Sequence, residues 1–405
     1  MDRISKHFKR LFFAVLIAST LACRLAIRGI NPPVPQIDTP TPTVFLTRTY
    51  TPTATRTPTS TPEPSATPTP TATPTPFFWV EPGTPLPGFS QSITLDTAGQ
   101  LSALAEWHEE SIADLEWSPD GELLAVASPA RINFYDPKTR QLLRTLHPTK
   151  EGIVDIAFSP GGSWLVAGCR QGDETSGFSS SLDLWAGPNW KPLGLLYGVV
   201  AGLSSMSFLP DGQILAVAYA APGYAGKNYI DFWAVPSWII NTSMDTDKLQ
   251  EVAFSPDGRF FVNTPDRYAI QVWDLIEKKL LYTIPTSFTG AVNRFAFSPD
   301  GDFLAAGHYD GMVRIYDLNT GEVALAFDTG AVVQSIAYSS DGEIIAIGGS
   351  FENSHIQLWA RGSGKLLRSI DNQTGGISSL IFSATQRFLA SGSYDGTVRL
   401  WGVRP

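Results

Sequence analysis

A short turn signal recurs seven times in this chain, and the repetition constrains the fold more than any other feature of the sequence. Its fullest form is Ser-Pro-Asp-Gly, in which proline presets φ at the first corner, aspartate bonds back to the backbone and glycine accepts a left-handed conformation. Successive turns start 41, 50, 46, 43, 41 and 44 residues apart. They begin at Ser118, Ser159, Leu209, Ser255, Ser298, Ser339 and Ser383, the last copy being degenerate. This period predicts one supersecondary unit repeated seven times.

Apolar strands with fixed aromatic positions surround each turn. An aromatic residue stands immediately before the turn, and the residue before it is small in most copies. Because alternate side chains of a strand face opposite sides, each sheet offers one bulky and one mostly small face to its neighbours. The aromatic residues are Trp117, Phe158, Phe208, Phe254, Phe297, Tyr338 and Phe382, and a later strand of each repeat closes on Tyr135, Trp185, Trp233, Trp273, Tyr316, Trp359 or Trp401.

The period and the closing Trp or Tyr resemble the WD40 repeat family, over roughly residues 99–405. The resemblance implies an all-β, seven-bladed β-propeller with four-stranded antiparallel blades. The last repeat stops without an outer strand of its own, and residues 101–107 look like one. In WD40 proteins such an N-terminal strand completes the final blade, and we expect the same closure here. The family's usual Gly-His before the inner strand is missing, so its His-containing hydrogen-bond network is not expected.

The N-terminus has the pattern of an export signal. Residues 1–22 begin with basic side chains and continue as an apolar run, which predicts a signal peptide. Residues 20–23, Thr-Leu-Ala-Cys, resemble a bacterial lipobox, which implies a lipid anchor on Cys23, although Thr20 stands where lipoboxes prefer leucine. Cleavage to a soluble form and retention as an uncleaved anchor remain open. We expect a secreted protein or one on the extracytoplasmic face of the cell membrane.

A Pro/Thr-rich segment follows the signal. Residues 23–77 are too poor in large apolar side chains to form a core, and their prolines favour extended polyproline II, so they predict a disordered linker. Residues 78–98 lead into the propeller. The linker either spaces the propeller from the membrane or merely tethers it.

Charge and motifs exclude several functions. The formal net charge is -9 without a basic stripe, which argues against nucleic acid as a partner. Nucleophile elbows, phosphate loops and metal-spaced His and Cys pairs are all missing from the sequence. We therefore predict no catalytic residue, no metal and no cofactor. The two cysteines, Cys23 and Cys169, are not expected to form a disulfide.

Mostly polar residues occupy the position four residues before each turn, and we call these seven the column residues. The resemblance places them on the innermost strands, near the upper mouth of the central channel. They are Asp114, Asp155, Ser205, Glu251, Arg294, Ser335 and Ser379. Such a ring could hold a cationic group, a peptide terminus or a metal. The alternative is a hydrated channel lining. The candidate binding residues among them are Asp114, Asp155, Glu251 and Arg294.

Three insertions separate the second and third strands of their repeats, at residues 171–181, 219–229 and 350–355. The resemblance places all three on the upper face. The first two carry aromatic side chains that we expect to be exposed for recognition. These candidate binding residues are Phe178, Tyr219, Tyr224 and Tyr229. The alternative is ordinary variation in loop length.

The leading hypothesis from the sequence is an exported, monomeric scaffold that binds a protein or peptide on its upper face. A competing hypothesis is a propeller enzyme, a hydrolase or lyase, that uses Asp114, Asp155 and Glu251. A third is a carbohydrate- or cell-wall-binding module, in which the tyrosines stack on sugar rings.

Overall fold

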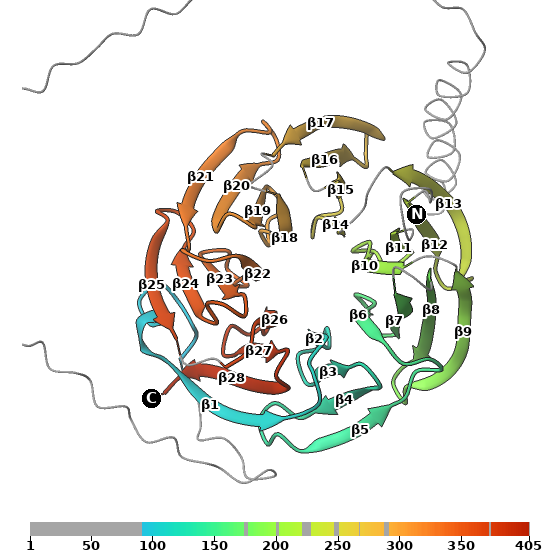
Figure 1. Ribbon diagram of the computed structural model, residues 1–405, viewed down its shortest axis with the longest axis horizontal. Helices are drawn as coiled ribbons and strands as arrows, with labels where there is room; N and C mark the ends of the chain where they lie inside the picture. The colour runs from blue at the N-terminus through green and yellow to red at the C-terminus, as the bar shows by residue number, and fades with distance from the viewer. Residues whose placement is uncertain are drawn as a thin grey trace, which may run out of the picture. The chain divides into compact units, whose positions relative to one another are not determined.

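Seven four-stranded antiparallel sheets stand around a common axis in the computed structural model (Figure 1). The structure describes residues 91–173, 177–199, 202–220, 228–246, 251–266, 268–286, 291–371 and 374–404. The predicted all-β, seven-bladed propeller is confirmed. The predicted signal peptide, Cys23, the linker and most of the lead-in segment lie outside the described residues.

The strands of blades 1 to 3 follow one another in chain order from the axis outward. Blade 1 contains β2 (Asp114–Trp117), β3 (Leu124–Ser128), β4 (Arg131–Tyr135) and β5 (Leu142–Leu146). Blade 2 contains β6 (Ile153–Phe158), β7 (Trp164–Asp173), β8 (Gly177–Ala186) and β9 (Lys191–Val199). Blade 3 contains β10 (Gly202–Phe208), β11 (Ile214–Ala220), β12 (Asn228–Ala234) and β13 (Ile239–Thr246).

Blades 4 to 6 keep the same order. Blade 4 contains β14 (Val252–Phe254), β15 (Phe260–Asp266), β16 (Ala269–Asp274) and β17 (Lys279–Pro285). Blade 5 contains β18 (Val292–Phe297), β19 (Phe303–His308), β20 (Met312–Asp317) and β21 (Val323–Asp328). Blade 6 contains β22 (Val333–Tyr338), β23 (Ile344–Gly349), β24 (Ile356–Ala360) and β25 (Lys365–Ile370).

Blade 7 combines strands from both ends of the described chain. It contains β26 (Ile377–Phe382), β27 (Leu389–Ser393), β28 (Thr397–Val403) and, in the outer position, β1 (Leu101–His108), which follows the short 3-10 helix η1 (Ala98–Gln100). Strand β1 pairs antiparallel with β28, from Leu101 opposite Val403 to His108 opposite Thr397. With this pairing the seventh sheet has four strands, as each of the other six sheets has.

The repeated turns adopt the geometry that their residues favour. In the first, the Gly121 amide donates to the Ser118 carbonyl over 2.7 Å, and Gly121 has φ +71°. The Ser118 hydroxyl donates to Asp120 over 2.5 Å and accepts from the Leu123 amide over 2.9 Å. The side chain of the first turn residue therefore fixes the start of the next strand.

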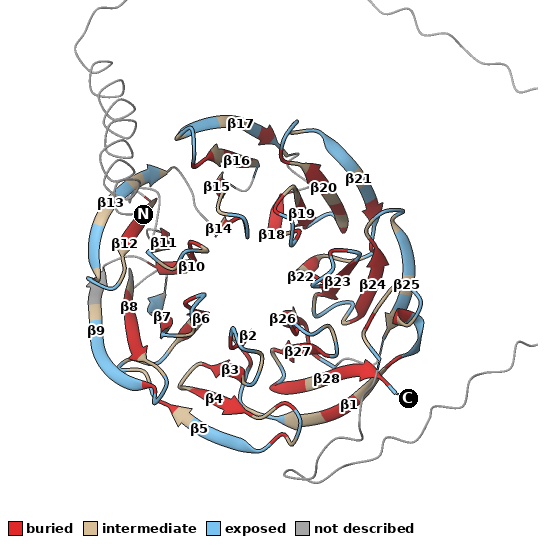
Figure 2. Cartoon of the chain, turned by 180° about the vertical axis from the view of Figure 1, so that it is seen from behind, coloured by how far each residue is buried: buried red, intermediate tan, exposed pale blue. Residues whose placement is uncertain are grey.

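Buried side chains fill the spaces between neighbouring blades. Ala125 and Ala127 of β3 join Ile156 and Phe158 of β6 in one buried cluster. Bulky side chains of one blade thus meet small ones of the next, as the sequence predicted. By contrast, the outer strands β5, β13, β17, β21 and β25 begin with exposed residues (Figure 2). In the described part of the chain, no helix is long and apolar enough to cross a membrane.

Candidate functional site

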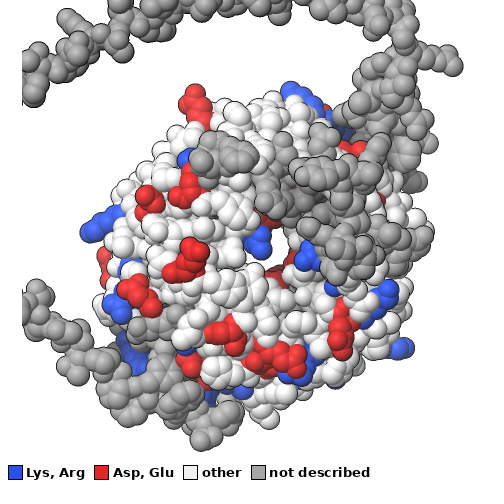
Figure 3. All heavy atoms as spheres, viewed as in Figure 1, with Lys and Arg blue, Asp and Glu red and all other residues white. Residues whose placement is uncertain are grey.

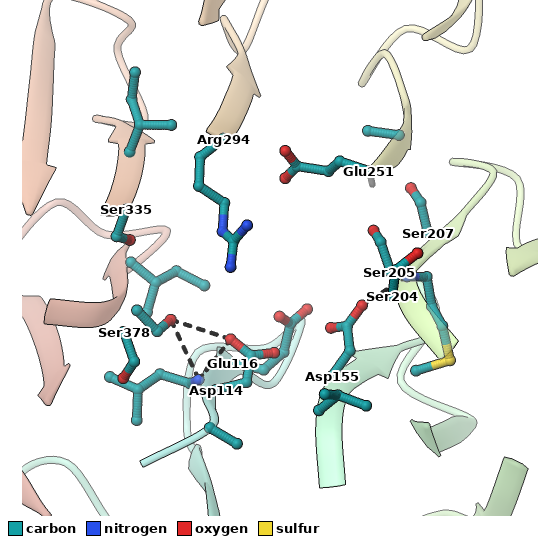
Figure 4. Close-up of a pocket in the computed structure, with 18 of the residues that line it drawn as sticks. Asp114, Glu116, Asp155, Ser204, Ser205, Ser207, Glu251, Arg294, Ser335 and Ser378 are labelled. Carbon is teal, nitrogen blue, oxygen red and sulfur yellow. Dashed lines mark hydrogen bonds between the residues drawn. The ribbon is translucent and has the colours of Figure 1, made fainter. Parts of the chain in front are cut away.

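A single cavity of about 310 Å³ collects the column residues at the axis of the propeller. All seven line it, together with Glu116, Ser204, Ser207 and Ser378 (Figure 4). The innermost strands bring these side chains together from all seven blades. The sequence therefore grouped Asp114, Asp155, Glu251 and Arg294 correctly, whereas their role in binding stays a prediction. We call this space the axial cavity.

Three acidic column residues bond to the backbone of the following blade. Asp114 accepts a hydrogen bond from the Ile156 amide over 3.2 Å, and Asp155 accepts one from the Met206 amide over 2.6 Å. Glu251 accepts one from the Phe295 amide over 3.1 Å. In each case the donor directly follows the column position of the next blade.

Serine performs the same task at two other junctions. The Ser205 hydroxyl accepts from the Val252 amide over 3.4 Å, and the Ser379 hydroxyl accepts from the Leu115 amide over 3.3 Å. The innermost strand is the inner edge of its sheet, so these amides have no strand partner on that side. Because an unpaired amide in a partly buried site is costly, the column side chains stabilise the junctions.

A second layer of bonds lies two residues further along the innermost strands. Ser207 accepts from the Phe254 amide over 3.3 Å, and the Glu116 carboxylate accepts from the Phe158 amide. Sequence reasoning missed both residues and missed this structural role altogether. The signal was available, since both stand two positions after a column residue and point to the same side of their strand.

Arg294 and Ser335 depart from this pattern. Arg294 has no acceptor atom to offer, and its guanidinium donates to the Asn293 carbonyl over 2.9 Å. Ser335 is only 6% exposed and makes no hydrogen bond to any described residue. Both side chains point into the axial cavity (Figure 4). Asn293 links blades 5 and 6 instead, by donating to the Val333 carbonyl over 2.6 Å.

Burial makes the carboxyl groups of the axial cavity hold their protons more tightly. It raises the pKa of Asp114, and it raises those of Asp155 and Glu116 further, with the nearby Asp114 charge adding to the effect. Burial raises the pKa of Glu251 to about 7, although the Arg294 guanidinium opposes the shift. The cavity is hollowed at the axis, with acidic and basic atoms beside it (Figure 3). Because these carboxyl groups have raised pKa values, the net charge of the axial cavity near neutral pH depends on what occupies the cavity.

The described residues include no group of three or more His, Cys, Asp or Glu side chains placed to hold a metal ion together. Cys169 is buried and free, and burial raises the pKa of its thiol to about 12.

The predicted exposure of Tyr219 is wrong. Tyr219 is 1% exposed and its ring centre lies 5.1 Å from that of Tyr229, its partner in the pairing of β11 with β12. The strands continue into what the sequence suggested was a loop, so the tyrosine joins the core. Strand β8 likewise includes Phe178, whose backbone pairs with Gly172. The side chain of Phe178 and the whole of Tyr224 lie outside the described residues.

The sixth-blade insertion carries an exposed aromatic residue that sequence reasoning did not single out. Phe351 is 63% exposed, and its ring stacks on Tyr394 of blade 7 with centres 5.2 Å apart and planes 20° apart. We call this pair the rim stack. A Cβ added to Gly376 would lie 3.2 Å from Cδ2 of Phe351, and the Tyr394 amide donates to the Gly376 carbonyl over 3.1 Å.

Gly376 precedes β26, whose Ser378 and Ser379 line the axial cavity. The rim stack therefore lies beside the start of β26. We call the end of the propeller at which this strand begins the cavity-lining end. A phenylalanine inside an otherwise polar insertion was the signal that could have found it.

Comparison with known proteins agrees with the architecture. The family described as "WD domain, G-beta repeat" matches residues 140–174, 278–317 and 364–402. The chain is 25% identical over 260 residues to telomerase protein component 1 of Rattus norvegicus, which covers 63% of this chain but 9% of that protein. It is 25% identical over 173 residues to periodic tryptophan protein 2 of Arabidopsis thaliana, covering 42% of this chain and 19% of that protein.

A guanine nucleotide-binding protein subunit beta of Nicotiana tabacum is similar over more of its length. It is 22% identical over 317 residues, which cover 74% of this chain and 82% of that protein. The matched repeats and the seven four-stranded sheets lead to one conclusion: this chain carries WD40 repeats and forms a seven-bladed β-propeller.

Proposed function

We propose that this protein is an interaction scaffold, acting as a single propeller, that binds a protein or peptide at the cavity-lining end. The observation that carries the proposal is the rim stack, in which Phe351 is 63% exposed yet held against Tyr394. Aromatic side chains on loops fixed by a rigid framework give a large contact area at low entropic cost. Support also comes from the similarity to a protein named as a subunit of a guanine nucleotide-binding protein.

The two other functions considered from the sequence have less support. For an enzyme, Asp114, Asp155 and Glu251 would have to supply the catalytic groups, and the contact observed for each of them, with a backbone amide of the next blade, is a structural one. For sugar stacking, Tyr219 would have to be accessible, and it is buried. Neither alternative has an observation that favours it over partner binding.

Capture of a partner by the full chain tests the proposed function. The purified protein serves as bait for an envelope extract of its own source, and bound proteins are quantified by mass spectrometry. Double substitution Phe351→Ala with Tyr394→Ala should reduce the captured partner at least about tenfold, because truncating buried aromatic anchors costs about 2 kcal/mol or more. The matched control is Ile276→Ala, which removes a similarly exposed apolar side chain, 70% accessible, from the turn before β17. Equal capture by the double variant and the control would contradict the proposal.

We further propose that the protein is exported and tethered to the membrane through Cys23. The support is the basic and apolar pattern of residues 1–22 and the Pro/Thr-rich segment after it. Labelling with a radioactive fatty acid should mark the wild-type protein and not Cys23→Ala. Label that survives this substitution would contradict lipidation at Cys23.

A further inference from the structure

The axial cavity has more carboxyl groups than its own cation can balance. Asp114, Glu116, Asp155 and Glu251 line it, and Arg294 is the one Lys or Arg among its lining residues. Arg294 extends from blade 5 into the middle of the cavity (Figure 4), and its guanidinium lowers the pKa of Glu251. The three acids of blades 1 and 2 therefore outnumber the positive charge that Arg294 supplies. A cation entering beside them would favour their ionised forms.

A second, independent observation comes from blade 6. The Ser335 hydroxyl points into the cavity, its residue is only 6% exposed, and it has no hydrogen bond to any described residue. A hydroxyl that faces a cavity keeps its hydrogen-bonding capacity for whatever fills the space. The serines at the equivalent position of blades 3 and 7 do have partners, on the following blade. Ser335 is therefore available to a ligand.

From these two observations we infer that the axial cavity binds one organic cation, an ammonium or guanidinium group. The inference rests on the proposed function, since the group would be a lysine or arginine side chain of the bound partner. The cavity volume of about 310 Å³ is roughly ten times the space that one water occupies, which leaves room for such a side chain. A metal ion fits less well, because no three acidic, His or Cys side chains of the described residues converge on one point.

The geometry also indicates how the cation would be held. Carboxylates of Asp155 and Glu116 would accept its N–H groups, since each accepts one backbone amide, Asp155 bonds in addition to Asp114, and a carboxylate can accept about four hydrogen bonds. The Ser335 hydroxyl would accept another. Charge-assisted bonds of this kind are stronger than neutral ones, so the acids would distinguish a cation from a neutral group of the same shape.

Small probes test the inference on the full chain without any partner. The cationic probes are N-acetyl-lysine methylamide and N-acetyl-arginine methylamide, and the neutral ones are the norleucine and citrulline equivalents. Binding is measured by saturation-transfer NMR and calorimetry at pH 8. We expect the lysine or the arginine probe to bind at least tenfold more tightly than its neutral equivalent, and the better of the two identifies the headgroup. Equal binding of charged and neutral probes would overturn the inference, and so would displacement of both cations by millimolar Ca²⁺.

Two variants locate the site. Glu116→Gln keeps an acceptor for the Phe158 amide but removes a charge, and it should weaken the cationic probe at least fivefold. Ser335→Ala removes a hydroxyl that makes no bond in the described structure, so it should fold normally and weaken the probe about threefold. The matched control is Glu343→Gln, an exposed turn residue outside the cavity. Unchanged affinity in Ser335→Ala or in a folded Glu116→Gln overturns the inference. Because no partner is present, this failure is separate from a failure of Phe351-dependent capture.

Discussion

At the scale of single residues, one side-chain position performs two tasks around the ring. Asp155 illustrates the first, because it accepts the Met206 amide of the next blade, and Ser335 illustrates the second, because it faces the cavity without a partner. The sequence predicted the position of both, since each stands four residues before a turn. It could not predict the difference between them, because the amide that bonds to Asp155 lies 51 residues away in the chain.

Protonation of Glu251 should make stability depend on pH. Burial raises the pKa of this carboxyl from 4.5 to about 7 in the folded state. Between these values the folded state binds more protons than the unfolded state, so this group makes stability fall as pH rises from about 4.5 to 7. The charged groups facing it are Arg294 from β18 and, across the cavity, Asp114, Glu116 and Asp155.

Glu251→Gln removes this titration and keeps an acceptor for Phe295. Relative to the wild type, the variant should gain about 2–3 kcal/mol of unfolding free energy between pH 5 and pH 8, because one pKa unit is worth about 1.4 kcal/mol and the raised pKa lies about two units above pH 5. Urea unfolding at both pH values measures the difference. If the wild type and the variant differ in unfolding free energy by the same amount at pH 5 and at pH 8, the raised pKa of Glu251 is contradicted.

At the scale of strands, prediction from the sequence succeeded where the repeat is regular and failed where it is extended. Turn positions and the bulky and small faces of the inner strands follow from local rules, and they are observed. Tyr219 was misjudged because β11 and β12 continue past the length typical of the other blades, which depends on pairing between strands rather than on local residue type. Phe351 was overlooked because its exposure depends on contacts with blade 7.

Close approach between neighbouring blades explains a glycine near the end of β27. A Cβ added to Gly392 would lie 2.5 Å from Cγ2 of Ile112, which packs ahead of β2. Gly392→Ala should therefore push blade 7 away from blade 1 and lower the free energy of unfolding by about 1–3 kcal/mol. The matched control is Gly362→Ala, where an added Cβ meets nothing within 4 Å. Thermal unfolding of both variants checks this, and a Gly392→Ala protein as stable as the control would show that the blades are not in such close contact.

At the scale of the whole molecule, the propeller has two unlike regions to offer a partner. The cavity-lining end combines the rim stack with the axial cavity. The circumference instead carries scattered exposed aliphatic side chains on the outer strands, among them Leu143, Ile239 and Val323. Among the described residues, similar side chains recur on blade after blade there, and no single patch of them stands out. The proposed function therefore requires that the cavity-lining end is the face that binds the partner.

Hydroxyl-radical footprinting of the full chain, with and without the captured partner, tests this claim most directly. We predict reduced oxidation at Phe351, Tyr394 and Met206, which lie at the rim stack or line the axial cavity, and unchanged oxidation at Leu143 and Ile239 on the outer strands. Protection confined to the outer strands, with Phe351 oxidised as fast in the complex as in the free protein, would contradict it.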